Sequence, residues 1–187
     1  MVYDLEKIRY QFDTVKPDFV IVSHASNVFG LIAPVEDIFA LAKKYEAITL
    51  VDMAQTAGLV DLNVGLTTID FAVFAGHKTL YGPFGIGGFI NVSAVPLDTF
   101  IVGGTGSDSL NLEMPSGNET RYESSSSNIV AIAGLNAALE CLNQKDYFDQ
   151  EQEMTSYLVK QLDSVKKSKN VSPVKSRKTC WNCICYY

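Results

Sequence analysis

Residues 18–52 read DFVIVSHASNVFGLIAPVEDIFALAKKYEAITLVD, and this stretch decides the fold. Its two apolar runs, residues 18–23 and 48–51, are short and rich in β-branched side chains, which is typical of strands that are covered on both faces. Between them, residues 34–47 place their apolar side chains on one helical face, and Pro34 stands at the first turn that proline favours. Strand, helix and strand in this order predict a crossover unit with parallel strands.

The alternation continues on both sides of this unit. We expect helices over residues 4–15, 128–142 and 147–165, a buried strand over 70–74, and further strands over 86–92 and 99–102. Residues 103–127 are rich in Gly, Ser, Asn and Pro and predict a long loop. The fold class is therefore α/β, with three layers, α/β/α, around a mostly parallel sheet.

Composition and charge narrow the classes of function. The 187 residues are 47% apolar and 19% charged, so the chain can bury a core. A net charge of -6 argues against nucleic acid or an anionic membrane as the main partner. The start of the chain lacks the apolar region of a signal peptide, and no apolar run reaches membrane length, so we expect a cytoplasmic protein. No metal site is expected, because the cluster of Cys180, Cys183 and Cys185 has no fourth ligand nearby.

Polar side chains follow each of the three apolar runs. Asn27 comes after the first run, Asp52 and Gln55 after the second, and His77 and Lys78 after the third. Because ligands gather at the carboxyl ends of strands in open parallel sheets, these side chains are expected to line one crevice. Such a crevice would suit an anionic, heteroaromatic ligand that carries a carbonyl group, because it offers a carboxylate, two amides, an imidazole and an amine. This description fits pyridoxal 5'-phosphate.

The needs of this cofactor assign a role to each residue. Lys78 would form the Schiff base with the aldehyde, and Asp52 would pair with the protonated ring nitrogen. Gln55 and Asn27 would donate to the ring hydroxyl, and His77 would donate to the phosphate. The neighbouring His24 is expected to be a packed, hydrogen-bonded histidine rather than a site residue.

Several stretches carry a resemblance to a known family. SHASNVFG (residues 23–30), VDMAQTAG (51–58) and FAGHKTLYGPFGIGG (74–88) resemble, in order and spacing, successive signatures of class V aminotransferase-like enzymes. The likeness is strongest to the cysteine desulfurase and selenocysteine lyase group. IVGGTGSDSLNLEMP (101–115) and RYESSSSNIVAIAGLNAAL (121–139) resemble a later segment of the same family.

The resemblance implies the large domain of a fold-type I pyridoxal-phosphate enzyme that cleaves the C–S bond of cysteine or selenocysteine. Lys78 would hold the cofactor and move the proton on the substrate α-carbon. Ser126 falls where the family has a Thr that reaches the phosphate of the neighbouring subunit, which implies a homodimer. A small amino acid would be the substrate, and a sulfur-acceptor protein a further partner. Two departures are that Ala75 replaces a phosphate-binding Ser and that residues 124–127 replace a run richer in Gly, Thr and Pro.

The match covers only part of such enzymes. We expect a partial cofactor-binding large domain over residues 1–143, a linking helix over 144–168 and an irregular tail over 169–187, in a truncated chain whose tail follows a shifted reading frame. Neither the Arg that binds the substrate carboxylate nor the Cys that takes up sulfur has a matching segment. The alternatives are a class V aminotransferase or lyase that acts on another amino acid, or a catalytically incompetent fragment that acts only in dimerisation. A nucleotide-binding module is not expected, because no phosphate loop opens a helix.

Overall fold

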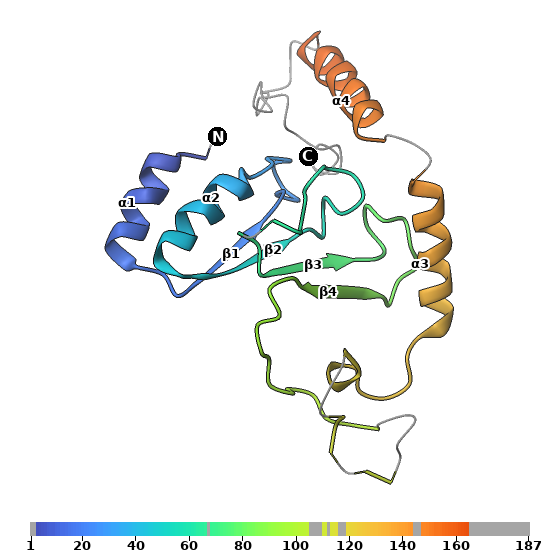
Figure 1. Ribbon diagram of the computed structural model, residues 1–187. Helices are drawn as coiled ribbons and strands as arrows, with labels where there is room; N and C mark the ends of the chain where they lie inside the picture. The colour runs from blue at the N-terminus through green and yellow to red at the C-terminus, as the bar shows by residue number, and fades with distance from the viewer. Residues whose placement is uncertain are drawn as a thin grey trace.

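The computed structural model provides four helices, four strands and two short 3-10 turns within the part of the chain that it describes (Figure 1). The described residues are 3–66, 68–104, 110–111, 113–115, 119–143 and 147–164. In chain order the elements are α1 (Leu5–Val15), β1 (Phe19–Ser23), α2 (Val35–Ala42), η1 (Lys43–Tyr45), β2 (Ile48–Asp52), β3 (Phe71–Ala75), β4 (Gly87–Asn91), η2 (Glu119–Tyr122), α3 (Ile129–Leu142) and α4 (Tyr147–Ser164). None of the described helices is both long enough and apolar enough to cross a bilayer.

The strands form one sheet in the order β1-β2-β3-β4. β1, β2 and β3 are parallel, and β4 is antiparallel to β3. The predicted α/β class and the mostly parallel sheet are thus confirmed. Residues 99–102, expected as a further strand, are irregular, so this prediction was wrong. The expected tail over 169–187 lies outside the described residues.

The core lies between one face of the sheet and α2. Phe39 and Ala42 of α2 are fully buried, as is Val51 of β2. Val20 of β1 and Ala72 of β3 pack into the same cluster. Full burial of a side chain such as Phe39 contributes roughly 1.5–3 kcal/mol, so this single layer of contacts fixes α2 on the sheet.

The opposite face of the sheet remains open over the described residues. Phe19, Ile21 and Phe89 point to this face and are 49%, 60% and 46% exposed. α3 packs beyond the ends of the strands, where Leu135 contacts Leu80 in a smaller cluster. The described residues therefore supply two of the three expected layers.

A partly buried ion pair joins the amino ends of the strands. Lys43 donates to the carboxylate of Asp70, which also accepts from the backbone N–H of Thr49 at 2.7 Å and from its hydroxyl at 3.1 Å. Burial acts to raise the pKa of Asp70, but these hydrogen bonds outweigh it and hold the pKa below its usual value. The pair thus joins η1, β2 and the start of β3 at the edge of the sheet where the parallel strands begin.

We expect Asp70→Asn to lower the free energy of unfolding by about 3 kcal/mol, because it leaves the ammonium of Lys43 without its charge partner. The pKa of Asp70 is lower in the folded than in the unfolded chain, so its contribution is present above pH 3.8 and is lost as the pH falls further. Urea denaturation at pH 7 and at acidic pH measures both effects. Glu6→Gln, which breaks the exposed pair with Arg9, is the control and should cost less than about 1 kcal/mol.

Candidate functional site

A cavity lies where the parallel strands end. Its volume is about 330 Å³, within the range of roughly 300–1,000 Å³ that is usual for small-molecule sites. It is lined by Tyr3, Ser23, Ala25, Ser26, Asn27, Asp52, Ala54, Gln55 and Lys78. Four of the six predicted site residues therefore come together in one place, and their roles stay predictions.

The sheet register positions the carboxylate of Asp52. Ser23 at the end of β1 pairs with Asp52 at the end of β2. The hydroxyl of Ser23 donates to Oδ2 of Asp52 at 3.3 Å, and the backbone N–H of Ala54 donates to Oδ1 at 2.9 Å. Both carboxylate oxygens thus have a donor that fixes their orientation.

Lys78 reaches the cavity from the turn after β3. Its backbone carbonyl accepts from the N–H of Tyr81 at 2.9 Å, which closes the turn. The side chain is half-buried, and none of the hydrogen bonds or ion pairs found among the described residues involves its amine. A lysine amine without a carboxylate partner is suited to act as a nucleophile toward a carbonyl group.

His77 and Ser126 lie outside the cavity lining. The imidazole of His77 is exposed and stacks on Phe84, with 4.7 Å between ring centroids. Ser126 is exposed in the segment between η2 and α3. Neither is brought against the four residues of the cavity, so their predicted contacts with phosphate remain hypotheses.

The lining also includes residues that the sequence analysis missed. Ser23 ends its strand beside Asp52, which only the register reveals. The Ser26 hydroxyl oxygen accepts from the backbone N–H groups of Val28 and Phe29, both at 3.2 Å, and so shapes the loop after β1. A serine whose hydroxyl accepts from the backbone two or three residues later is a known sequence signal for a turn. Nothing in the sequence pattern pointed to Tyr3.

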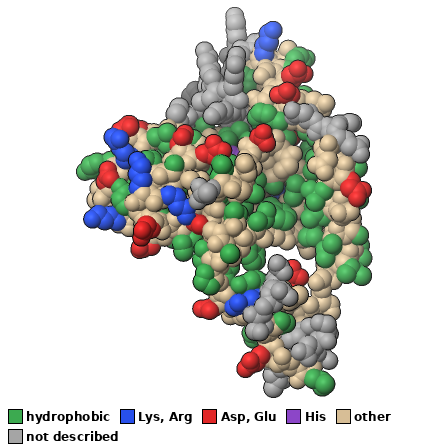
Figure 2. All heavy atoms as spheres, in the orientation of Figure 1, with side chains coloured by type: hydrophobic (Ala, Val, Ile, Leu, Met, Phe, Trp, Pro, Cys, Tyr) green, Lys and Arg blue, Asp and Glu red, His purple; other side chains and the backbone are tan. Residues whose placement is uncertain are grey.

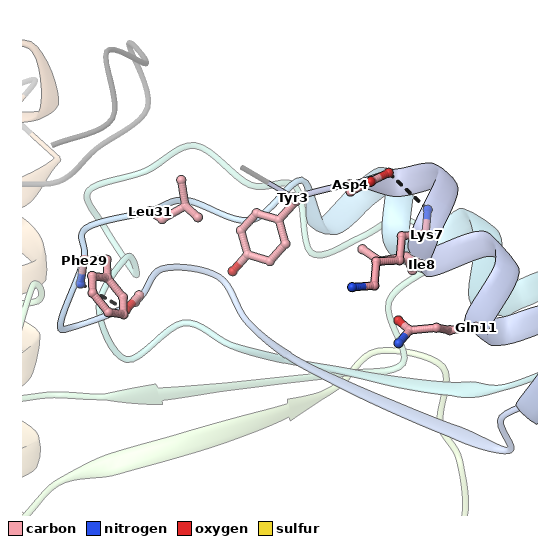
Figure 3. Close-up of a pocket in the computed structure, with 8 residues that line it drawn as sticks. Tyr3, Asp4, Lys7, Ile8, Gln11, Phe29 and Leu31 are labelled. Atoms are coloured by element: carbon pink, nitrogen blue, oxygen red, sulfur yellow. Dashed lines mark hydrogen bonds between the residues drawn. The ribbon is translucent and has the colours of Figure 1, made fainter. Parts of the chain in front are cut away.

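A second cavity of about 590 Å³ adjoins the first, since Tyr3 and Ser26 line both. Figure 3 shows Tyr3 between the loop that carries Phe29 and Leu31 and the side of α1 that carries Lys7. The two cavities together make a continuous region between α1 and the carboxyl ends of the strands. Across the described residues, no group of three or more His, Cys, Asp or Glu side chains could hold a metal ion.

His24 stands beneath the cavity as a packed residue, as its sequence context predicted. It is 4% exposed, and its Nδ1 lies 2.9 Å from the hydroxyl of Thr56. Burial lowers its pKa below the ordinary value of 6.5, because the charged form loses hydration. His24 therefore connects the loop after β1 with the turn after β2 in its neutral form.

The fold and the cavity together define an α/β protein with a lysine-bearing ligand site at the carboxyl ends of its strands. The family model of aminotransferase class-V matches residues 1–185, so the chain belongs to this family of pyridoxal-phosphate-dependent enzymes. This result confirms the family that the motifs predicted.

Individual relatives agree with this assignment. The cysteine desulfurase of Shigella sonnei is 34% identical over 169 residues, which make up 86% of this chain and 41% of that enzyme. A probable cysteine desulfurase of Chlamydia trachomatis is 33% identical over 155 residues, or 78% of this chain and 38% of that protein. The apo structure of a cysteine desulfurase from Thermococcus onnurineus has a TM-score of 0.77 and 26% identity, and the match covers 96% of this chain and 46% of that one. The chain thus spans less than half the length of these proteins.

The burial of His24 predicts how stability depends on pH. Its pKa is lowered in the folded chain, so protonation favours unfolding, and the free energy of unfolding should fall as the pH drops below 6.5. Each proton taken up on unfolding contributes at most about 1.4 kcal/mol per pH unit. Denaturant unfolding between pH 7 and pH 5 measures this slope. His24→Asn should flatten it, whereas Thr56→Val, which keeps the imidazole buried, should retain it; an equal slope in the His24→Asn variant would contradict the assignment.

Proposed function

We propose that this chain carries the cofactor-binding part of a pyridoxal-phosphate-dependent cysteine desulfurase, with Lys78 as its catalytic residue. The observation that carries this proposal is the convergence of Asn27, Asp52, Gln55 and Lys78 on one cavity. Cysteine or selenocysteine is the proposed substrate, and the cysteine desulfurases among the relatives support this choice.

The donor set of the cavity fits the proposed cofactor. Its carboxylate has both oxygens oriented by neighbouring donors, its amine has no charged partner among the described residues, and two amides stand beside them. When bound, pyridoxal phosphate supplies an aldehyde that reacts with amines and a ring that withdraws electrons from the substrate α-carbon. A site for this group needs a lysine and a carboxylate in one cavity, and Lys78 and Asp52 meet that requirement.

Each of the four predicted residues in the cavity then has a proposed role. Asp52 would pair with the protonated ring nitrogen, and the donors from Ser23 and Ala54 orient its carboxylate. Asn27 and Gln55 orient the ring through its hydroxyl group. Lys78 Nζ would hold the cofactor through its aldehyde and would also move the proton on the substrate α-carbon.

The phosphate group is proposed to lie between two subunits of a homodimer, held by His77 and by Ser126 of the partner subunit. The exposed apolar face of α3 supports dimerisation, because Ile129 and Val130 are 73% and 79% exposed. Figure 2 shows hydrophobic side chains gathered on the side of the molecule where α3 lies.

The remaining assignments complete the proposal. Residues 1–143 are a partial cofactor-binding large domain, residues 144–168 a linking helix and residues 169–187 a tail. The protein acts in the cytoplasm and passes sulfur to an acceptor protein. Action on another amino acid, as a class V aminotransferase or lyase, would use the same cavity, whereas a structural dimerisation unit would not need Lys78 at all.

We expect the purified chain to develop a visible absorbance band on addition of pyridoxal phosphate, and borohydride to fix the cofactor to Lys78. Lys78→Ala should abolish both the band and the fixed adduct, because Lys78 is the one lysine among the described residues that line this cavity. Lys16→Ala, at an exposed lysine after α1, is the matched control and should behave like the unchanged chain. A band that persists in Lys78→Ala, or no band in any chain, would favour the structural dimerisation unit.

The proposed dimer predicts a second outcome. Val130→Asp places a charge on the exposed apolar face of α3 and should convert a dimer of twice the chain mass into a monomer, because burying an unpaired charge is costly. Sedimentation velocity measures the mass. Tyr10→Asp changes an equally exposed apolar residue on α1 and should leave the dimer intact; loss of the dimer in both variants would place the interface elsewhere.

A further inference from the structure

The connection between β3 and β4 folds back on itself and carries His77, Lys78 and Phe84. The backbone N–H of Gly76 donates to the carbonyl of Ile86 at 2.9 Å, and the N–H of Gly82 donates to the carbonyl of Gly76 at 2.8 Å. These two bonds close the connection at its base. As a result, residues seven positions apart in the sequence lie side by side.

Close backbone approach fixes the path of this connection. A Cβ atom on Gly82 would lie 2.9 Å from the carbonyl oxygen of Gly76, and a Cβ atom on Gly76 would lie 3.0 Å from that of Ile86. Neither position tolerates a side chain without a shift of the backbone. The connection also packs on α3, where Pro83 lies against Gly134. The position of Phe84 is therefore set by backbone contacts rather than by a pocket for its ring.

Among the described residues, the Phe84 ring has one ring partner. It stacks on the imidazole of His77 with centroids 4.7 Å apart and an interplanar angle of 25°. Phe84 is 81% exposed, so the core does not hold its ring. Within the described residues, no hydrogen bond to the His77 ring is found. The stack is thus the contact that orients this imidazole.

A stacked imidazole has a particular chemical use. Its two nitrogens lie in the plane of the ring, so a partner on the ring face leaves both nitrogens open to a ligand at the ring edge. An N–H group at that edge suits an anion with several acceptor oxygens, such as a phosphate group. In the proposed function, the phosphate group of the cofactor lies beside His77, one residue from the cavity-lining Lys78.

We propose that Phe84 is a positioning residue that orients the imidazole of His77 for the phosphate group of pyridoxal phosphate. This inference rests on the proposed function of the cavity. It predicts that Phe84 affects the affinity for the phosphate group and leaves the reaction of the aldehyde with Lys78 in place.

The test compares three variants at position 84. Phe84→Leu and Phe84→Ala remove the aromatic face, and Phe84→Tyr keeps it. We expect the first two to raise the Kd for pyridoxal phosphate about fivefold, while the Kd for pyridoxal, which has no phosphate, stays constant. Phe84→Tyr should restore the original Kd to within about twofold. Equal losses for both ligands would overturn the inference, because they would indicate damage to the whole site.

A second measurement, by NMR, detects the stacking of Phe84 on His77 directly. The chain has two histidines, so the ring protons of His24 and His77 can be assigned in a proton–carbon NMR spectrum with the variant His77→Asn. Ring-current shifts of His77 should vanish in Phe84→Leu and persist in Phe84→Tyr, while the signals of His24 stay unchanged. Unmoved His77 signals in Phe84→Leu would overturn the proposed contact.

Inorganic phosphate separates failure of this inference from failure of the proposed function. Without any cofactor, added phosphate should shift the His77 signals in the unchanged chain and in Phe84→Tyr, and shift them much less in Phe84→Leu. A chain that forms no adduct at Lys78 but shows this response would refute the proposed function and retain the role of Phe84. Equal responses in all variants would overturn that role even where the adduct forms.

Discussion

The parallel register of β1, β2 and β3 is the constraint on which the rest of the structure depends. It pairs Ser23 with Asp52 and Asp52 with Val73, so the polar residues that follow each strand emerge at one edge. A shift by one residue would turn Asp52 toward the core under α2, where a carboxylate without partners is costly. The ion pair between Lys43 and Asp70 stabilises the opposite edge of the sheet, where the parallel strands begin.

The same register explains why one face of the sheet is packed and the other open. Apolar residues that alternate with the site residues face α2 and form the core, whereas those in line with Asp52, such as Ile21 and Phe89, face away from it. The site therefore lies on the less covered face, at the end of the strands. In the described residues its walls come from the strand ends, from the loops that follow them and from Tyr3, just before α1. The exposed apolar side chains of Ile21 and Phe89 lie on the same face of the sheet.

The sequence predicted the elements well because their patterns are local. The strands at residues 18–23 and 48–51 and the helices from Asp4 and Asn128 follow from periodicity and capping, and Asp4 and Asn128 each cap a helix through their side-chain oxygen. The grouping of Asn27, Asp52, Gln55 and Lys78 followed from the rule for strand ends. The hydroxyl of Ser23 and the wall formed by Tyr3 could not be predicted, because they depend on register and on the packing of α1. The irregular path of residues 99–102 shows that apolar content alone does not make a strand.

His77 and Lys78 are adjacent in the chain, but only Lys78 lines the cavity. Both follow the same strand, and a rule based on strand ends assigns them to the same crevice. The turn after β3 instead sends Lys78 toward the cavity and leaves His77 outside it against Phe84. Because His77 lies outside the cavity, the cavity wall does not orient its ring. The stack on Phe84 does so instead, and close backbone contacts at Gly76 and Gly82 fix the loop that carries both rings. If His77 binds the phosphate group and Lys78 reacts with the aldehyde, as proposed, then affinity for the anionic group and reactivity of the lysine depend on different contacts, although the two residues are neighbours in the chain.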